Sequence, residues 1–261
     1  MTKTKLTSQQ QTAEAFKALG LPKEALPRHI AMIMDGNGRW AQRQGKARTF
    51  GHAKGAEAVR KIVTTCAQLE IDVLTLYSFS IENWSRPEEE VHFLMDLYVQ
   101  YLQEERQTMI QNNVKFVQIG TRQGLSPRLL EELDKTAQIT EKHTGLTLAL
   151  ALNYGSRTEI TDAVRAIAQK VKNAELDPQD ISPQTIDDHL YTRILPVPDP
   201  DLLIRTAGEM RISNYLLWQI SYAEIVVNQD CWPDYSPQHL FQDLRTYAQR
   251  TRKFGAVIDQ T

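Results

Sequence analysis

Short apolar runs and longer amphipathic segments alternate along this chain. The apolar runs have the length of buried strands, and they lie at residues 30–34, 73–79, 114–119, 146–152, 202–204 and 225–227. Apolar residues spaced three and four positions apart predict helices at residues 13–19, 59–66, 88–111, 127–143, 157–172, 183–190 and 237–253. Strands that alternate with helices favour an α/β fold, in which helices cover both faces of a central, mostly parallel sheet.

The composition is that of an ordinary globular protein. The 261 residues carry a formal net charge of −2, which gives no reason to expect a nucleic-acid partner. Two cysteines cannot form a disulfide framework, and no segment approaches the ~18 apolar residues of a membrane span. The first residues lack the apolar core of a secretory signal. We therefore expect a cytoplasmic protein, and any association with a membrane is expected to be peripheral.

The domain organisation is simple. Residues 1–25 are expected to form a polar N-terminal segment with one short helix, and residues 26–261 a single domain. The proline-rich stretch at residues 195–200 is too short to separate two domains.

The first predicted strand stops at Asp35, and Gly36, Asn37, Gly38 and Arg39 follow it. A carboxylate at a strand end, bare backbone amides and an arginine together suit a metal-bound phosphate. Asp-Gly and Asn-Gly are also common hairpin-turn dipeptides, so a plain tight turn is an alternative.

A dinucleotide-binding loop is a second alternative, because Gly36-x-Gly38-x-x-Ala41 fits the required glycine spacing. That loop needs an acidic residue near the end of the second strand, about 20 residues further on. Glu57 lies at this distance but inside a predicted helix, so the spacing excludes the dinucleotide interpretation.

Two further polar groups, at residues 80–86 and 205–213, directly follow predicted strands, as does Asn153. Because the carboxyl ends of parallel strands meet at one edge of a sheet, we expect these groups to converge with Asp35. The glutamates at 88–90 are interpreted as complementing the dipole of their own helix, without a functional role.

With these groups in view, the chain resembles the cis-prenyltransferases, specifically bacterial isoprenyl transferases such as undecaprenyl diphosphate synthases. The matching stretches are HIAMIMDGNGRWAQRQGKARTFGHAKGAE, LTLYSFSIENWSRPEEEV and DLLIRTAGEMRISNYLLWQISYAEIVV with the later WPDY. The resemblance implies a Mg²⁺-dependent, repeated condensation of isopentenyl diphosphate with an allylic diphosphate such as farnesyl or geranylgeranyl diphosphate. Each step forms a cis double bond and releases diphosphate. The family also implies a homodimer and a polyprenyl product that carries glycans.

The resemblance also assigns roles to residues. Asp35 corresponds to a magnesium ligand and central catalytic residue, Asn83 to the proton acceptor and Glu224 to a second magnesium ligand. A neutral amide accepts protons poorly, so we interpret Asn83 as orienting a water or a diphosphate oxygen. The implied substrate contacts are Gly36, Asn37, Gly38, Arg39, Trp40, Arg48, His52, Ser80, Ile81, Glu82, Trp84, Arg86, Arg205, Arg211, Ile212 and Ser213.

A growing prenyl chain needs an apolar tunnel. Leu94, Met95 and Tyr98 on one predicted helix, with the strand at 146–152, are candidates for its wall.

A non-catalytic partner subunit is the alternative function within this family. Such a subunit would be expected to lack the loop at 35–39 or the arginines at 205 and 211, and this chain keeps both.

Overall fold

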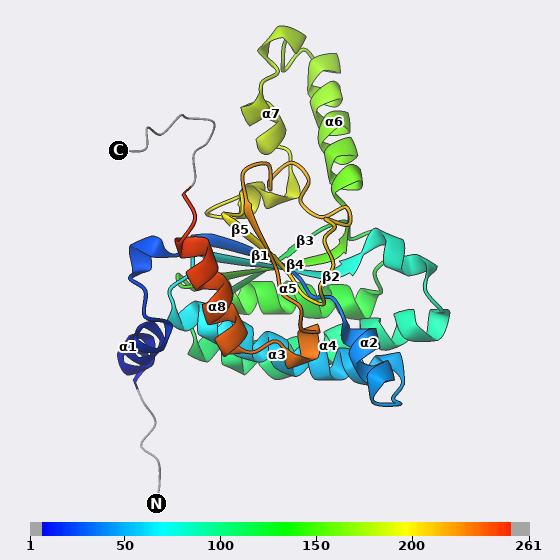
Figure 1. Ribbon diagram of the computed structural model, residues 1–261. Helices are drawn as coiled ribbons and strands as arrows, with labels where there is room; N and C mark the ends of the chain where they lie inside the picture. Colours follow the sequence, from blue (N-terminus) through cyan, green and yellow to red (C-terminus); the bar gives the residue numbers. More distant parts are fainter. Residues whose placement is uncertain (1–6, 252–261) are drawn as a thin grey trace, which may run out of the picture.

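Six parallel strands form the centre of the molecule, in the order β3-β4-β2-β1-β5-β6 (Figure 1). The computed structural model describes residues 7–251. The six predicted strands are confirmed, with these bounds: β1 His29–Ile33, β2 Val73–Ser80, β3 Lys115–Ile119, β4 Thr147–Tyr154, β5 Leu202–Arg205 and β6 Glu224–Val227. The sheet is therefore wholly parallel, as the alternation of strands and helices predicts.

Helices cover one face of this sheet, and two others project from the opposite side (Figure 1). The covering helices are α1 (Ser8–Leu19), α3 (Arg48–Gln68), α4 (Glu88–Gln111), α5 (Pro127–Thr140) and α8 (Pro237–Ala248). The projecting helices are α6 (Ser156–Lys172) and the short α7 (Pro183–Asp187). Each corresponds to a predicted helix. The last was predicted to reach residue 253 but ends at Ala248, and residues 252 and 253 lie outside the described part of the chain.

Strand β1 shows how the core divides between the two faces. Ile30 and Met32 pack among the covering helices, whereas Ala31 and Ile33 face the opposite cluster. The segment after β5 covers that second face with Tyr215 and other apolar residues. All five residues of β1 are buried, and its residues Ile30–Ile33 form a continuous apolar run, as is typical of strands in parallel sheets.

The interpretation of residues 35–38 as a hairpin turn is wrong. An additional short helix, α2 (Asn37–Arg43), begins directly after Gly36, and β1 makes only parallel pairs. Gly36 has φ of +98°, the left-handed conformation that turns the chain from the strand into this helix. The Asp-Gly-Asn-Gly sequence therefore marks a strand-to-helix junction.

The N-terminal helix is longer than predicted. It begins at Ser8 because Thr7 and Gln10 form a capping box, in which each side chain bonds the other's backbone N–H. Its C-terminal carbonyls, at Ala18 and Leu19, accept hydrogen bonds from Arg245 of α8 at 3.0 and 2.9 Å. The helix thus lies against the body of the molecule, and the domain boundary after residue 25 stays a prediction.

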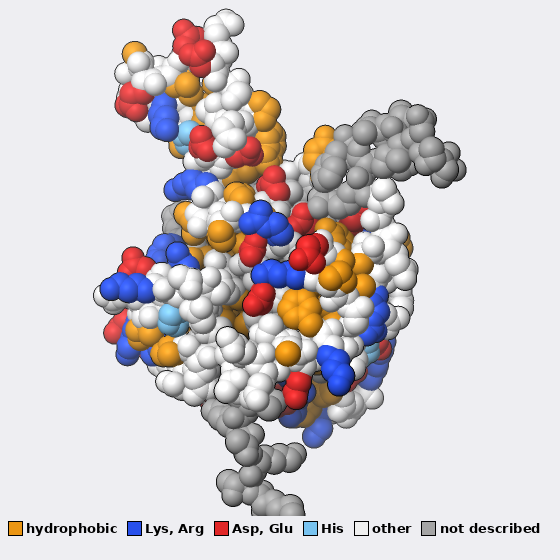
Figure 2. Space-filling view, turned by 90° about the vertical axis from the view of Figure 1, so that its left-hand side faces the viewer, with side chains coloured by type: hydrophobic (Ala, Val, Ile, Leu, Met, Phe, Trp, Pro, Cys, Tyr) orange, Lys and Arg blue, Asp and Glu red, His pale blue; other side chains and the backbone are white. Residues whose placement is uncertain are grey.

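The described residues include no helix with the length and apolar character needed to cross a membrane. Figure 2 shows one face of the molecule, on which acidic and basic side chains are interspersed.

His29, the first residue of β1, should make folding sensitive to acid. It is fully buried, its Nε2 lies 2.7 Å from Thr75 Oγ1, and burial lowers its pKa to about 4 despite the nearby charge of Asp201. Between pH 6.5 and about 4 the unfolded chain binds more protons at this position, so stability falls as pH falls through that interval. The expected loss is roughly 3 kcal/mol.

Urea unfolding of the parent and a His29→Gln variant at pH 7 and pH 4.5 would measure this contribution. The variant should lose less unfolding free energy than the parent between the two pH values. Parallel losses in the two proteins would contradict the assignment.

Candidate active site at the carboxyl ends of the strands

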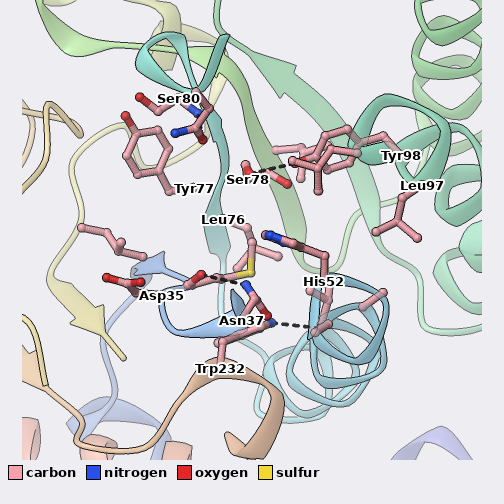
Figure 3. A pocket seen from close by; sticks show the side chains of 18 of the residues that line it. Asp35, Asn37, His52, Leu76, Tyr77, Ser78, Ser80, Leu97, Tyr98 and Trp232 are labelled. Carbon is pink, nitrogen blue, oxygen red and sulfur yellow. Dashed lines mark hydrogen bonds between the residues drawn. The ribbon is translucent and has the colours of Figure 1, made fainter. Parts of the chain in front are cut away.

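The loops that follow β1, β2 and β5 meet around one cavity of about 580 Å³ (Figure 3). This is the convergence that the parallel-strand rule predicts, except that Asn153 lies within β4 and does not line the cavity. The cavity brings together many of the sequence-predicted residues: Asp35, Asn37, His52, Ser80, Glu82, Asn83, Arg86, Arg205, Arg211 and Ser213.

Asp35 lies two residues beyond the end of β1 and is held from several sides. Its Oδ2 accepts a hydrogen bond from Arg205 Nη2 at 2.8 Å, and its Oδ1 accepts one from the Gly36 N–H at 2.6 Å. Arg39 Nη2 lies 3.4 Å from the same Oδ1. The Thr206 hydroxyl bonds both the N–H and the carbonyl of Asp35, at 2.9 and 2.8 Å. The carboxylate therefore has a fixed position and direction.

The surroundings also keep Asp35 ionised. Burial opposes ionisation, but the hydrogen bonds from Arg205 and from the Gly36 N–H, with the charge of Arg39, outweigh it. They hold the pKa of this carboxyl below its usual value. Asp35 is therefore an anionic oxygen donor at neutral pH.

The backbone approaches the site closely at Gly36. A Cβ at this position would lie 2.8 Å from both Ala207 Cβ and Cys231 Sγ, so only glycine fits between the loops. The turn at Gly36 brings the start of α2, at Asn37, to the polar end of the cavity, which we call its mouth. The first N–H groups of a helix have no acceptor within it and can donate to an anion.

In the loop after β2, Asn83 folds back onto Ser80. Its Oδ1 accepts the backbone N–H of Ser80 at 3.1 Å, and the Ser80 hydroxyl bonds Glu82. This arrangement caps a short 3-10 turn, Ile81–Ser85, which sets the path of the loop. The hydrogen bond to Ser80 fixes the Asn83 amide within the turn that it caps, and its role in proton transfer stays a prediction.

A residue that the sequence analysis dismissed, Glu90, contacts two residues of the cavity lining, His52 and Arg86. It is 9% exposed, and three cationic or titratable side chains surround it. Glu90 lies 3.1 Å from Arg48 Nε, 3.1 Å from Arg86 Nη1 and 3.5 Å from His52 Nε2. Burial opposes its ionisation, but these partners lower its pKa. The sequence did not predict these contacts, because an acidic residue at this position also fits the first turn of a helix.

His52 is uncharged at neutral pH. Burial and the nearby charge of Arg86 lower its pKa to about 4, and the attraction of Glu90 does not compensate. The positive charge at this part of the mouth therefore comes from the two arginines.

Arg205, at the end of β5, joins two of the converging loops. It is 5% exposed, and its Nη1 donates to Ser213 Oγ at 2.8 Å and to the Arg211 carbonyl. Its Nη2 reaches Asp35. Arg211 is exposed beside the cavity, where its guanidinium pairs with Glu209, which also binds Arg39. One buried guanidinium thus fixes Asp35 and Ser213 relative to each other.

Other predicted residues surround the cavity without lining it. Trp40 stacks on Phe50 and donates to Asp234 at 2.8 Å, and Trp84 donates to Asn153 at 2.8 Å. Ile212 packs in the second-face core, and Ile81 lies beside Gly155. The remaining members of this group are Gly36, Gly38, Arg39 and Arg48.

Glu224 is not brought to Asp35 within this chain. It begins β6 opposite Leu202, whereas Asp35 follows the other end of the sheet, near Arg205. Its carboxylate pairs with Arg250 at 2.7 Å. A shared role of Asp35 and Glu224 in magnesium binding stays a prediction.

The deeper part of the cavity is apolar and runs between the sheet and α4. Leu94 and Tyr98 from α4, with Leu148 and Leu150 from β4, line it as expected, whereas Met95 does not. Figure 3 shows Asp35 and Ser80 on one side of this space and Tyr98 and Leu97 on the other. Lining residues that the sequence analysis did not single out include Tyr77, Tyr101, Met109, Phe116 and Asn214.

Known proteins share this architecture and sequence. A family model described as "Putative undecaprenyl diphosphate synthase" matches residues 33–255. An isoprenyl transferase of Shouchella clausii is 47% identical over 232 residues, which cover 89% of this chain and 90% of that protein. The ditrans,polycis-undecaprenyl-diphosphate synthase ((2E,6E)-farnesyl-diphosphate specific) of Haemophilus influenzae is 46% identical over 237 residues, covering 91% of this chain and 98% of that protein.

Solved structures agree with these relatives. The lavandulyl diphosphate synthase of Lavandula x intermedia, in complex with dimethylallyl diphosphate, matches with a TM-score of 0.87 and 35% identity, covering 89% of this chain and 99% of that chain. A structure titled as a probable undecaprenyl diphosphate synthase from Campylobacter jejuni matches with a TM-score of 0.73 and 29% identity, covering 88% and 98%. From the conserved sequence and fold together, this chain belongs to the undecaprenyl diphosphate synthase family of cis-prenyltransferases.

Proposed function

We propose that this protein catalyses the Mg²⁺-dependent, sequential condensation of isopentenyl diphosphate with an allylic diphosphate such as farnesyl diphosphate. Each cycle releases diphosphate and adds a cis double bond, and the product serves as a polyprenyl carrier of glycans. The observation that carries the proposal is that one cavity combines a charged mouth with an apolar depth. The charged mouth can bind a diphosphate, and the apolar inner part can hold a prenyl chain.

The residues at the mouth fit a magnesium ion that is shared with substrate. Asp35 supplies an ionised carboxylate, and Mg²⁺ commonly binds through one or two carboxylates together with substrate phosphates and water. When bound, the ion would stabilise negative charge on the departing diphosphate.

The protein's own cations share that task. Arg39 lies beside Asp35, and together with the amides of α2 it can bind diphosphate oxygens as negative charge accumulates on them. Arg211 and Ser213, fixed by Arg205, can hold the second diphosphate and so position the attacking alkene. The proton released from the new unit would leave through a diphosphate oxygen or water that Asn83 orients.

A self-sufficient enzyme is a better explanation of this chain than a non-catalytic partner subunit. Such a subunit would not need Asp35 paired with the buried Arg205, or Arg205 and Arg211 both held at the cavity. The homodimer and the transient contact with a membrane surface stay predictions.

The direct test is to incubate the purified protein with Mg²⁺, farnesyl diphosphate and radiolabelled isopentenyl diphosphate. We expect labelled polyprenyl diphosphates, and we expect chelation of Mg²⁺ to stop their formation. Failure to extend the allylic primer would overturn the proposed function, and activity that survives chelation would overturn the metal requirement.

The inner end of the cavity should limit product length. Met109, Phe116 and Leu148 line it near the amino ends of β3 and β4, away from Asp35. A Met109→Phe substitution should therefore shorten the main product by one or more five-carbon units, because the larger ring fills space that the chain would occupy. Met95→Phe is the matched control, since Met95 lies on the same helix but does not line the cavity.

Chromatography of the dephosphorylated products would compare the two variants with the parent. An unchanged product distribution in Met109→Phe, or equal shortening in both variants, would contradict this placement of the tunnel's end.

A further inference from the structure

The side chain of Asn214 connects two of the loops that form the cavity. Its Nδ2 donates to Glu82 Oε1 at 2.7 Å, in the loop after β2. Its Oδ1 accepts the backbone N–H of Arg157 at 2.9 Å, and its carbonyl accepts the N–H of Ser156 at 2.9 Å. Asn214 is therefore bound both to the loop at residues 80–86 and to the start of α6.

The backbone around Asn214 is held in an unusual conformation. Ser213, Asn214 and Leu216 have φ of 55°, 60° and 48°, in the left-handed region that non-glycine residues seldom adopt. Asparagine tolerates this region better than most residues, and such strain persists only where surrounding contacts enforce it. Here Tyr77 donates to the Ser213 carbonyl at 3.2 Å, and Tyr215 donates to the Thr75 carbonyl at 3.1 Å.

The other end of the connection is equally well fixed. Glu82 lies in the same 3-10 turn that places Asn83, and its own N–H donates to Ser80 Oγ at 3.2 Å. Burial opposes ionisation of Glu82, but the bonds from Ser80 and Asn214 lower its pKa, so the acceptor is anionic. A charge-assisted hydrogen bond of this length is among the stronger links that a neutral amide can make.

We propose that Asn214 is a positioning residue that sets the separation of the two substrate diphosphates, by tying the loop at 80–86 to the loop at 205–214 through Glu82. The loops carry Asn83 and Arg86 on one side and Arg211 and Ser213 on the other. The reacting carbons meet only when both loops hold their substrates at the correct distance from each other. A misplacement of about 1 Å can lower the rate a hundredfold. The link to substrates rests on the proposed function, whereas the link between the loops does not.

Two substitutions separate the roles of this side chain. Asn214→Asp keeps the acceptor for the Arg157 N–H but replaces the donor to Glu82 with a like charge. Asn214→Gly keeps the left-handed backbone and removes both side-chain bonds. A double variant, Asn214→Asp with Glu82→Gln, restores a hydrogen bond across the same gap with donor and acceptor exchanged.

Hydrogen–deuterium exchange of the amides in residues 80–86 is the first readout, and it requires no activity. The Ser80 and Arg86 amides are bonded to Asn83 within this loop, so they report its order. We expect exchange here to speed up about tenfold or more in both single variants, and to return toward the parent's rate in the double variant. Faster exchange confined to residues 205–216, with no recovery in the double variant, would overturn the proposal.

Steady-state kinetics of the single variants is the second readout. We expect kcat for elongation to fall about ten- to a hundredfold with smaller changes in KM for either substrate. A rise in KM for isopentenyl diphosphate alone would mean that Asn214 serves only its own loop. If the parent protein elongates no primer, the proposed function fails, while the exchange result still decides whether the loops are coupled.

Discussion

Substituting Asp35→Asn should lower kcat for chain elongation by about a thousandfold or more, with the protein still folded. The substitution preserves the shape of the side chain but removes the ionised oxygen that faces the cavity. It removes a carboxylate that lies next to both Arg39 and Arg205 and that could share a magnesium ion with the diphosphate. Losses of this size are typical where a group stabilises charge that develops in the transition state.

The measurement is single-turnover elongation of an allylic diphosphate at saturating Mg²⁺, with circular dichroism to confirm the fold. Asp72→Asn is the matched control, because Asp72 pairs with Arg28 at the opposite edge of the sheet. A rate within tenfold of the parent for Asp35→Asn would rule out a central role for this carboxylate.

Substituting Glu90→Gln should raise KM for the allylic diphosphate about tenfold and lower the unfolding free energy by about 2 kcal/mol. Glu90 is the common partner of Arg48, Arg86 and His52. Without its charge the two guanidinium groups repel each other and are no longer held at the cavity mouth. We expect a smaller loss of unfolding free energy than for breaking a fully buried ion pair, because Arg48 and Arg86 are partly exposed to solvent.

Glu88→Gln provides the comparison, since Glu88 lies in the same helical turn with 86% of its side chain exposed. If Glu90 only complemented the helix dipole, the two substitutions would have similar small effects. Substrate titrations and urea unfolding of both variants decide between the two roles. Equal KM values for the two variants would show that Glu90 only complements the helix dipole.

The sheet and the location of the site follow from the sequence because both depend on local patterns. The apolar run at Ile30–Ile33 predicts a buried strand, and polar groups that directly follow β1, β2 and β5 are expected to meet at one edge of a parallel sheet. The same rule bears on Glu224, which begins β6 and so lies at the other edge. Its assignment as a magnesium ligand rests on the family resemblance alone.

Contacts between distant segments could not be predicted in the same way. Glu90 is identical in type and context to Glu88 and Glu89, and only the packing of α3 against α4 makes it the one that meets Arg48 and His52. Asn214 gives no signal because its partners lie 132 and 57 positions earlier. Helix α2 was missed because glycine and asparagine have low helix propensity, and the junction at Gly36 depends on the space left by Ala207 and Cys231.

The position of β1 in the sheet has a consequence for how the protein is made. β1 is the first strand synthesised, yet it lies between β2 and β5, and its partners Leu202–Arg205 emerge from the ribosome long after β2. Until then one edge of an apolar strand stays unpaired, which is a template for association between nascent chains. The strand that closes this edge also delivers Arg205 to Asp35, so pairing of the edge and formation of this contact both wait for the synthesis of β5.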